Sequence, residues 1–368
     1  GCALWLVPGA VRAQDATPAP TPPADAKDAD SKIELSGSID GYYGYNFEKP
    51  AGDNPFRAFD VKDNQFSFAL GELVINKNPK PLGFHIRLGF GKTADLVSAF
   101  EPGDKEVYKH IIQAYGTYVF DKKGSTVDFG KWVTPHGAEV IETQDNWNYT
   151  RGLLFTWAIP FYHMGIRAKT PLTSKLTLNG SISNGWNNVE DNNSDKTFGL
   201  GASYTLSPKL SVASNWMGGR EVVVAASPGP PVVASASRFR NLVDTIVTYN
   251  ATPKWSFILN HDFAWQDKLP GASRNAMWTG LAGYAKYAIN DVSAGVVRAE
   301  WFWDRDGFST GTSQTLKEVT ATYERKIAKN LITRLELRHD WSSQATFNDK
   351  GSPKKGQTTL TLGGVLLF

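Results

Sequence analysis

The sequence has very little cysteine and no long apolar run. It contains 368 residues and a single cysteine, so no disulfide can form within the chain. We find no stretch of 18 or more apolar residues, which argues against a membrane-spanning α-helix. Lys and Arg total 39 and Asp and Glu total 36, without the basic excess of a nucleic-acid-binding protein. These absences do not exclude a transmembrane β-barrel, because a barrel exposes only alternate residues to lipid and is polar overall.

Motifs of catalysis and metal binding are also missing. The six histidines show no H-E-x-x-H spacing, and thiolate ligands are lacking. There is no G-x-S-x-G elbow and no G-x-x-x-x-G-K-[ST] phosphate loop. We therefore predict no enzyme, no metal and no cofactor. An outer-membrane hydrolase that assembles Ser, His and Asp from separate strands stays an alternative, because such triads are defined by geometry.

The first 32 residues have the composition of a targeting segment followed by a linker. Residues 1–13 hold an apolar run and end in small residues, as does the remnant of a secretory signal peptide. An N-terminal strand or a short buried helix is the alternative for this segment. Residues 14–32 are rich in Pro and Ala, which predicts a disordered periplasmic linker because they bury too little apolar surface to become ordered.

From Ile33 to the end, apolar and polar residues alternate with the period of a β-strand. Short turns and long polar loops alternate between about 16 such segments, which is typical of an up-and-down outer-membrane barrel. The long loops are predicted near residues 48–63, 93–106, 135–152, 187–195, 217–240, 267–274, 304–313 and 342–356. We therefore predict an all-β fold, a transmembrane antiparallel β-barrel over residues 33–368, with both ends of the barrel on the short-turn, periplasmic side.

Aromatic residues gather at the ends of the predicted outward face, where rings with a polar edge suit the headgroup boundary. They are Tyr43, Tyr45, Phe47, Trp186, Trp216, Trp255, Trp265, Trp301 and Trp303. A Lys or Arg facing lipid at mid-bilayer costs roughly 2–4 kcal/mol, so the charged face should meet the lumen. His261 is an exception whose phase places it outward, and a neutral ring, a bulge or a phase slip would explain it. A soluble sandwich is the alternative fold, although its strands are shorter.

The inward charges are predicted to line a pore, because a barrel of about 16–18 strands leaves an aqueous channel. The pore-lining or constriction candidates are Arg87, Lys131, Glu139, Glu142, Asp145, Arg151, Arg167, Asp262, Arg298, Glu300, Arg334, Glu336 and Arg338. Charges of both signs favour small hydrophilic solutes and ions without strong ion selection. For any single charge, a salt-bridged wall residue is the alternative.

Two loops stand out. The loop 135–152 is long, charged and aromatic, and such a loop can fold inward and narrow the pore. An ordinary extracellular loop is the alternative. The loop 217–240 is unusually apolar, and the sequence leaves open whether it contacts lipopolysaccharide, a partner or the lumen.

Three stretches resemble the β-barrel porin-2 family, also called OmpL-like: residues 130–137, 148–151 and 159–167. The resemblance extends loosely over residues 33–368 and implies a porin in the outer membrane of a Gram-negative bacterium. It supplies no agreed binding residues. The segment 360–368 is similar to the last strand of outer-membrane proteins, which implies that Phe368 serves recognition by the barrel-assembly machinery.

We therefore predict an outer-membrane porin that forms a water-filled channel for passive diffusion of small hydrophilic solutes and ions. A structural or adhesin barrel whose lumen is plugged by a loop is the alternative. Besides solutes, the expected partners are outer-membrane lipid, lipopolysaccharide and the barrel-assembly machinery, with no nucleic acid. A homo-trimer and a monomer both fit the sequence.

Overall fold

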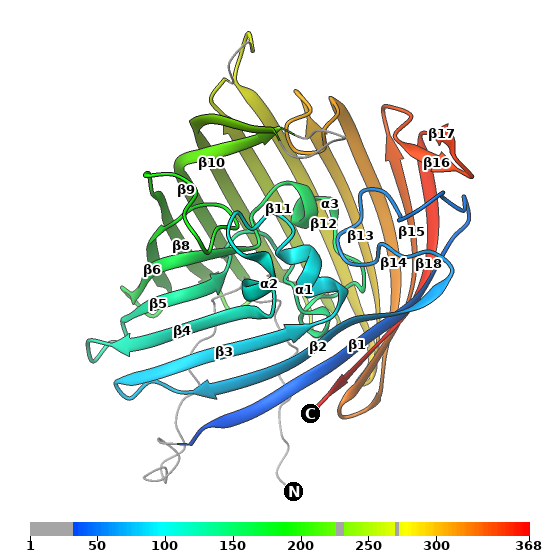
Figure 1. Ribbon diagram of the computed structural model, residues 1–368. Helices are drawn as coiled ribbons and strands as arrows, with labels where there is room; N and C mark the ends of the chain where they lie inside the picture. Colours follow the sequence, from blue (N-terminus) through cyan, green and yellow to red (C-terminus); the bar gives the residue numbers. More distant parts are fainter. Residues whose placement is uncertain (1–31, 226–231, 269–271) are drawn as a thin grey trace, which may run out of the picture.

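Sixteen strands form one closed antiparallel barrel, and two further short strands form a separate hairpin (Figure 1). The computed structural model describes residues 32–225, 232–268 and 272–368. The barrel strands are β1 (Glu34–Asn46), β2 (Gln65–Lys77), β3 (Leu82–Phe90), β4 (Ile111–Val119), β5 (Thr126–Val133), β6 (Tyr162–Pro171), β7 (Leu176–Ser183), β8 (Thr197–Ser207), β9 (Leu210–Ala225), β10 (Val232–Asn250), β11 (Trp255–Gln266), β12 (Ala276–Asn290), β13 (Ser293–Asp304), β14 (Gln314–Ala328), β15 (Leu331–Ser342) and β18 (Gly356–Leu367). The hairpin pairs β16 (Phe347–Asp349) with β17 (Ser352–Lys354). The prediction of a 16-strand antiparallel barrel is confirmed.

Each barrel strand pairs with its neighbours in sequence, and β1 closes the barrel by pairing with β18. Turns of two to six residues join the strands at one end, and the long loops lie at the other. The barrel begins at Glu34 and finishes at Leu367 on the short-turn end, as predicted. Residues 1–31 lie outside the described residues, so the signal-peptide remnant and the linker stay predictions.

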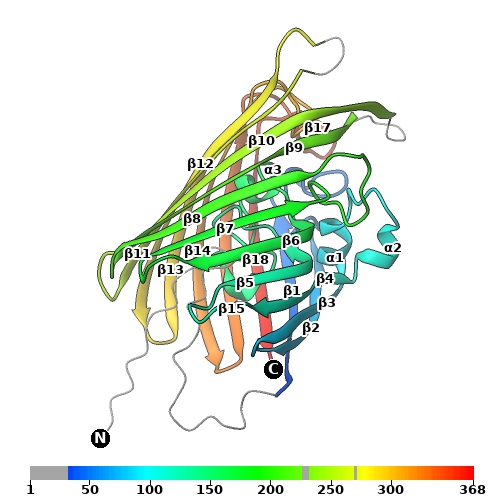
Figure 2. The ribbon, with the colours of Figure 1, turned by 90° about the vertical axis from the view of Figure 1, so that its left-hand side faces the viewer.

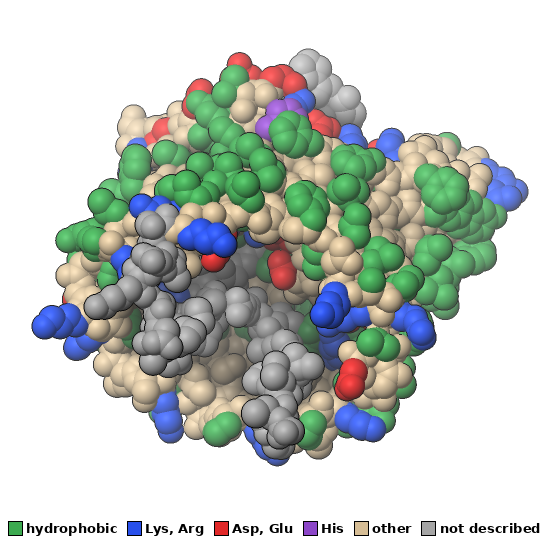
Figure 3. Space-filling model, turned by 90° about the horizontal axis from the view of Figure 1, so that it is seen from below, with side chains coloured by type: hydrophobic (Ala, Val, Ile, Leu, Met, Phe, Trp, Pro, Cys, Tyr) green, Lys and Arg blue, Asp and Glu red, His purple; other side chains and the backbone are tan. Residues whose placement is uncertain are grey.

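The outer wall of the barrel is apolar, because alternate residues point away from the lumen. In β11, for example, Phe257, Leu259 and Phe263 are exposed while Asn260 and Asp262 are buried. Seen from the short-turn end, hydrophobic side chains surround a hollowed centre (Figure 3). A lipid bilayer favours this arrangement, with apolar side chains on the outside of the barrel and polar side chains on the inside.

The structure tests two sequence-based statements about the outward face, the orientation of His261 and the position of Trp186. His261 does point outward, and β10, β11 and β12 pair through it without a register shift, so no bulge or phase slip is involved. The Thr279 hydroxyl lies 3.4 Å from its Nε2. The predicted outward position of Trp186 is wrong. This residue lies in the loop after β7, and its ring packs edge-on against Trp278 with ring centroids 6.2 Å apart.

The barrel wall is low on one side. Strands β3 to β7 have 8 to 10 residues, whereas β9 to β15 have 12 to 19 (Figure 2). Eight residues at roughly 3.3 Å each span about 26 Å, and a tilt of about 40° reduces the height to about 20 Å. The long-loop rim on this side is built up by α1 (Lys92–Val97) and α2 (Lys105–Tyr108). No helix in the described ranges is long and apolar enough to cross a membrane.

The apolar segment near 217–240 is not a loop, which corrects the sequence-based interpretation. Residues 217–225 continue β9 and residues 232–240 begin β10, and the two strands pair up to Ala225 and Val232. Beyond Gly218 and Arg240 these strands pair only with each other, because β8 and β11 stop there. Residues 226–231 lie outside the described residues. The segment therefore forms a hairpin that extends past the rim.

Candidate functional site

The connection between β5 and β6 runs through the inside of the barrel. It spans residues 134–161, called the lumen loop here, and contains a short 3-10 helix η2 (Thr143–Asp145) and the helix α3 (Leu153–Trp157). Its hydrogen bonds reach inward side chains on strands around the circumference. Among these partners are Asp40 on β1, Asn215 on β9, Asn260 on β11, Trp278 on β12, Thr322 on β14 and Glu336 on β15. The lumen loop therefore crosses the barrel interior.

Three arginines on the tall wall, which is formed by β9 to β15, bind carbonyl groups of the lumen loop. Arg298 donates to the Thr150 carbonyl at 2.6 Å and pairs with Glu139 at 2.6 Å. Arg334 donates to the Thr143 carbonyl at 2.6 Å, and Arg338 donates to the Arg151 carbonyl at 2.6 Å. All three guanidinium groups are at most 2% exposed. Planar guanidinium groups suit this task because each offers five donors in a rigid fork.

Carboxylates on the same wall hold the N–H groups of the lumen loop. Glu336 accepts from the Tyr149 N–H at 2.8 Å and the Thr150 N–H at 3.1 Å. Glu300 accepts from the Leu153 N–H at the first turn of α3. Arg298 lies 4.0 Å from Glu300 and pairs with the neighbouring Glu318 at 2.9 Å, so it compensates two carboxylates of this wall. Wall and loop thus form one buried network in which backbone and charged groups satisfy each other.

The first strands of the barrel also hold the loop, with fewer contacts. Arg87 on β3 pairs with Glu142 and lies 3.7 Å from Glu72. On β1, Asp40 accepts from the Tyr149 hydroxyl at 2.8 Å and from Thr143. The lumen loop therefore cannot swing aside as a rigid flap without breaking ion pairs on β3 as well as on β13.

A second segment, the loop 47–64 between β1 and β2, fills the long-loop end of the lumen. Phe59 packs edge-on against Phe155 and at a tilt against Phe161 of the lumen loop, with ring centroids 5.8 and 6.3 Å apart. Arg57 pairs with Asp340 at 2.8 Å. The two loops therefore share an apolar cluster inside the barrel.

Little space remains between the lumen loop and the wall. A cavity of about 10 Å³ lies next to Asp40 and Tyr149, and another of similar size lies next to His136 and His163. Each has room for about one water molecule. Nearer the short turns, inward groups such as Arg167 and Lys286 are partly exposed. The inward groups of the short-turn half are therefore reached by solvent, and this half is called the vestibule here. The long-loop half holds the lumen loop and loop 47–64.

The structure brings most of the predicted site residues together. The residues in the network of the lumen loop and its walls are Arg87, Glu139, Glu142, Arg151, Arg298, Glu300, Arg334, Glu336 and Arg338. Their role in a pore remains a prediction. Several of them are salt-bridged, as the alternative interpretation of these charges expects.

Three predicted residues lie apart from this network, and a fourth, Asp145, belongs to the lumen loop itself. Arg167 pairs with Asp128 at 2.7 Å in the vestibule, and Asp262 is fully buried opposite Asp244. Asp145 is exposed on η2. Lys131 has the strand phase of the outward-facing Phe129, and its ammonium donates to the Tyr108 carbonyl of α2 at 3.3 Å. Lys131 therefore lies against α2 and not among the network residues.

Sequence reasoning missed the contribution of loop 47–64. Arg57, Phe59 and Asp60 are each at most 6% exposed, although they lie in a segment rich in Pro, Gly and Asn that is typical of a surface loop. The mixture of aromatic and charged residues at positions 56–60 was the one feature of the sequence that could have indicated this burial. Among the described residues, no group of three or more His, Cys, Asp or Glu side chains could hold a metal ion.

His136 provides a pH test of the packing of the lumen loop. Burial lowers the pKa of its imidazole to about 3, and its Nδ1 has no hydrogen-bond partner among the described residues. The unfolded chain takes up a proton near pH 6.5, so stability is fully present above pH 6.5 and falls between pH 6.5 and about 3. This group alone should cost up to about 1.4 kcal/mol per pH unit in that window.

The variant His136→Gln should remove that part of the pH dependence. We expect the loss of unfolding free energy between pH 7 and pH 5 to be smaller in the variant than in the wild type, measured by urea unfolding in detergent. Equal losses in the two proteins would show that the imidazole is protonated in the folded state or accessible to water.

Several solved structures share this architecture. The trimer form of OmpT from Vibrio cholerae matches with a TM-score of 0.63 and 12% identity, covering 92% of this chain and 99% of that chain. The anion-selective porin from Comamonas acidovorans matches with a TM-score of 0.61 and 11% identity, over 92% and 100% of the two chains. The outer-membrane channel DcaP of Acinetobacter baumannii gives 0.60 and 11%, over 93% and 98%. The fold is that of the outer-membrane porins.

The family is shown by the sequence itself. The family described as "Putative beta-barrel porin-2, OmpL-like" matches residues 32–368. The chain belongs to this family of outer-membrane porins, as its resemblance implied. No curated protein matches the chain.

Proposed function

We propose that the protein is a passive channel of low conductance for small hydrophilic solutes in the outer membrane of a Gram-negative bacterium, with its narrowest section at the lumen loop. The observation that carries this proposal is the division of the lumen. An open vestibule of partly exposed polar groups leads to a loop that ion pairs hold across the barrel, including Arg87 with Glu142 and Arg298 with Glu139.

The charges at this narrow section favour solutes that are small and polar. Cationic and anionic side chains face each other there, which creates a transverse field. Such a field orients dipolar solutes, and the many internal ion pairs leave little net charge to select ions. We therefore expect weak selection between anions and cations.

Conductance across a planar bilayer tests the function. The purified, folded protein should give stepwise openings that are small for a 16-strand barrel, because the lumen loop occupies most of the cross-section. The absence of any conductance by folded protein would contradict the proposal.

A closed structural barrel is the second candidate, and the apolar cluster between loop 47–64 and the lumen loop favours it. Phe59, Phe155 and Phe161 exclude water from the long-loop end. A silent wild-type protein that conducts once the lumen loop is shortened would support this candidate over the first.

Association into a homo-trimer is supported by the low wall. The outer face of this wall and of the adjoining β8 exposes large apolar side chains, for example Phe129 on β5 and Leu200 on β8, each 63% exposed. A wall shorter than the bilayer's apolar thickness is better covered by protein than by lipid. Native mass spectrometry should detect trimers, and Leu200→Lys should convert them to monomers; a wild-type monomer would contradict this arrangement.

Phe368 closes the seam between the first and last strands. Its N–H donates to the Gly37 carbonyl at 3.0 Å, and its ring lies over Gly37, where an added Cβ would be 2.4 Å from the ring. We propose that this aromatic end also contacts the barrel-assembly machinery. Phe368→Ala should lower the amount of folded barrel in the outer membrane several-fold, measured by heat-modifiable electrophoresis. Phe120→Ala, an exposed aromatic at a short turn, is the control and should assemble normally.

A further inference from the structure

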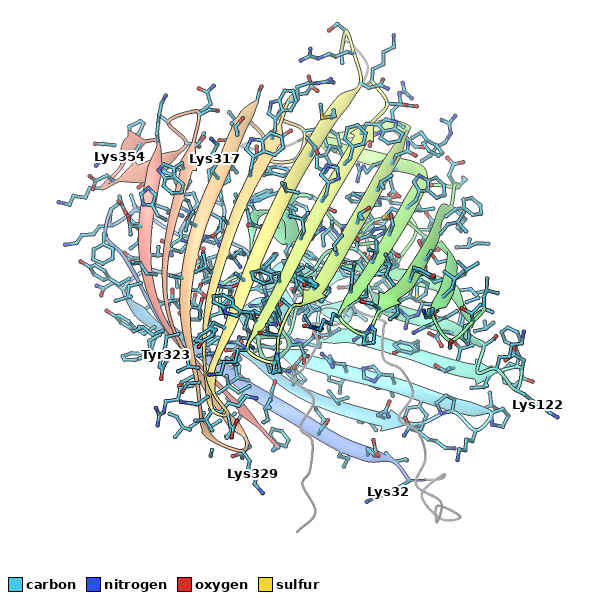
Figure 4. The ribbon with its side chains drawn as sticks, turned by 180° about the vertical axis from the view of Figure 1, so that it is seen from behind. Lys32, Lys122, Lys317, Tyr323, Lys329 and Lys354 are labelled. Atoms are coloured by element: carbon cyan, nitrogen blue, oxygen red, sulfur yellow. The ribbon has the colours of Figure 1, made fainter. Side chains whose placement is uncertain are left out.

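The tall wall carries a lysine where a lipid-facing residue is expected. Lys317 is the fourth residue of β14 and points outward near the long-loop end (Figure 4). The alternation around it is intact, since Glu318 is 1% exposed and faces the lumen. A cation on the lipid face is tolerated near the interface but costs roughly 2–4 kcal/mol at the midplane. Lys317 therefore marks the level of the lipid headgroups.

Two tryptophans flank this lysine in register. Trp301 on β13 and Trp341 on β15 are the direct cross-strand partners of Lys317. They are 37% and 42% exposed, so both indoles stand on the outer surface. Along β14, the outward neighbours of Lys317 are Thr315 and Val319. The ammonium group thus has no carboxylate among its nearest outward neighbours.

These residues form a groove with graded polarity. The groove has a volume of about 630 Å³ and is lined by Trp301, Thr315, Lys317, Trp341, Ser342 and Ser343. Its upper edge is fixed by Thr315 and Ser343, which exchange two hydrogen bonds of 2.9 Å. Toward the midplane lie Val319, which is 43% exposed, and its cross-strand partner His339, whose ring packs edge-on against Trp341. The next outward residue of β15 is Leu337, which is 50% exposed.

We propose that this groove binds the phosphorylated glycolipid of the outer leaflet, with the Lys317 ammonium on a sugar phosphate and the acyl chains between and below the two indoles. A molecule with a polar sugar, a phosphate and several acyl chains has the same order of polarity as the groove. Indole rings suit the boundary because they pack on acyl chains while the N–H stays near water.

The position of the groove on the barrel agrees with a lipid occupant. β14 lies eight strands from β6 in either direction round the barrel, and β6 belongs to the low wall. If copies of the chain associate through the low wall, the Lys317 groove faces outward into lipid. The inference depends on the outer-membrane location and not on conduction.

Titration of bisphosphorylated lipid A into the purified protein in detergent, followed by native mass spectrometry, tests the site. Lys317→Gln should weaken binding roughly fivefold, as expected for one cation near an anionic surface, and Lys317→Glu should weaken it further. Arg325→Gln is the matched control: it is exposed on the same face of β14 but at the short-turn end, and should bind within about twofold of wild type.

Three outcomes would overturn the proposal. They are equal binding by Lys317→Glu and wild type, equal weakening by Arg325→Gln, and equal affinity for phosphatidylglycerol and for lipid A. Inorganic phosphate at millimolar concentration should not compete, because it lacks the acyl chains; effective competition would indicate a simple anion site and also contradict the proposal. Conductance should be unchanged in Lys317→Gln, so failure of this site and failure of the channel are distinguishable.

Discussion

Replacing residues 138–151 by a short Gly-Ser linker should raise the single-channel conductance several-fold. These residues carry the loop side of the ion pairs with Arg87 and Arg298 and most of the backbone groups held by the wall. Without them the lumen should resemble the aqueous interior expected of a barrel of about 16 strands. Single-channel recordings in planar bilayers measure the change.

Shortening the hairpin Val222–Ser237 is the control for this experiment. Its strands extend beyond the pairing with β8 and β11, so its removal should leave the conductance unchanged. If the linker variant folds and conducts like the wild type, the lumen loop is not the narrowest section. Folding of each variant is checked by heat-modifiable electrophoresis before recording.

Arg298→Ala should destabilise the folded barrel by about 3–5 kcal/mol, the usual cost of removing one partner from a buried ion-pair network. Arg298 is fully buried and compensates Glu139 and Glu318 at 2.6 and 2.9 Å. Its removal leaves two carboxylates without that cation and the Thr150 carbonyl without its donor. Urea unfolding in detergent measures the difference.

Two further variants separate the network from general effects of losing a charge. Arg325→Ala removes an exposed arginine from β14 and should change the unfolding free energy by less than about 0.5 kcal/mol. Adding Glu139→Gln to Arg298→Ala should recover part of the loss, because one uncompensated carboxylate is neutralised. A loss below about 1 kcal/mol in Arg298→Ala would show that water already compensates these charges in the folded state.

The barrel itself was predictable because lipid and water impose a period of two on every strand that separates them. The segment Trp255–Gln266 shows this pattern most clearly. Its outward residues, including His261, and its inward polar residues face the sides that the alternation predicts. The same rule does not act on the hairpin around residues 222–237, which extends past the rim. The strand residues on either side of 226–231 were therefore mistaken for part of a long loop.

The assembled site was less predictable, because its contacts join residues far apart in the chain. Arg298 and Glu139 are 159 positions apart, and Arg57 and Asp340 are 283 apart. The strand period shows that Arg298 faces inward but gives no information on which loop enters to meet it. Lys131 could have been set aside, since it shares the phase of Phe129.

The closing seam of the barrel also constrains how the protein is made. Ser38 pairs with Leu367 and Gly37 with Phe368, so the first strand has no permanent neighbour on one side until the last residues exist. The cylinder can therefore close only when both β1 and β18 are present. Until then the unpaired edge and the apolar alternate residues favour aggregation.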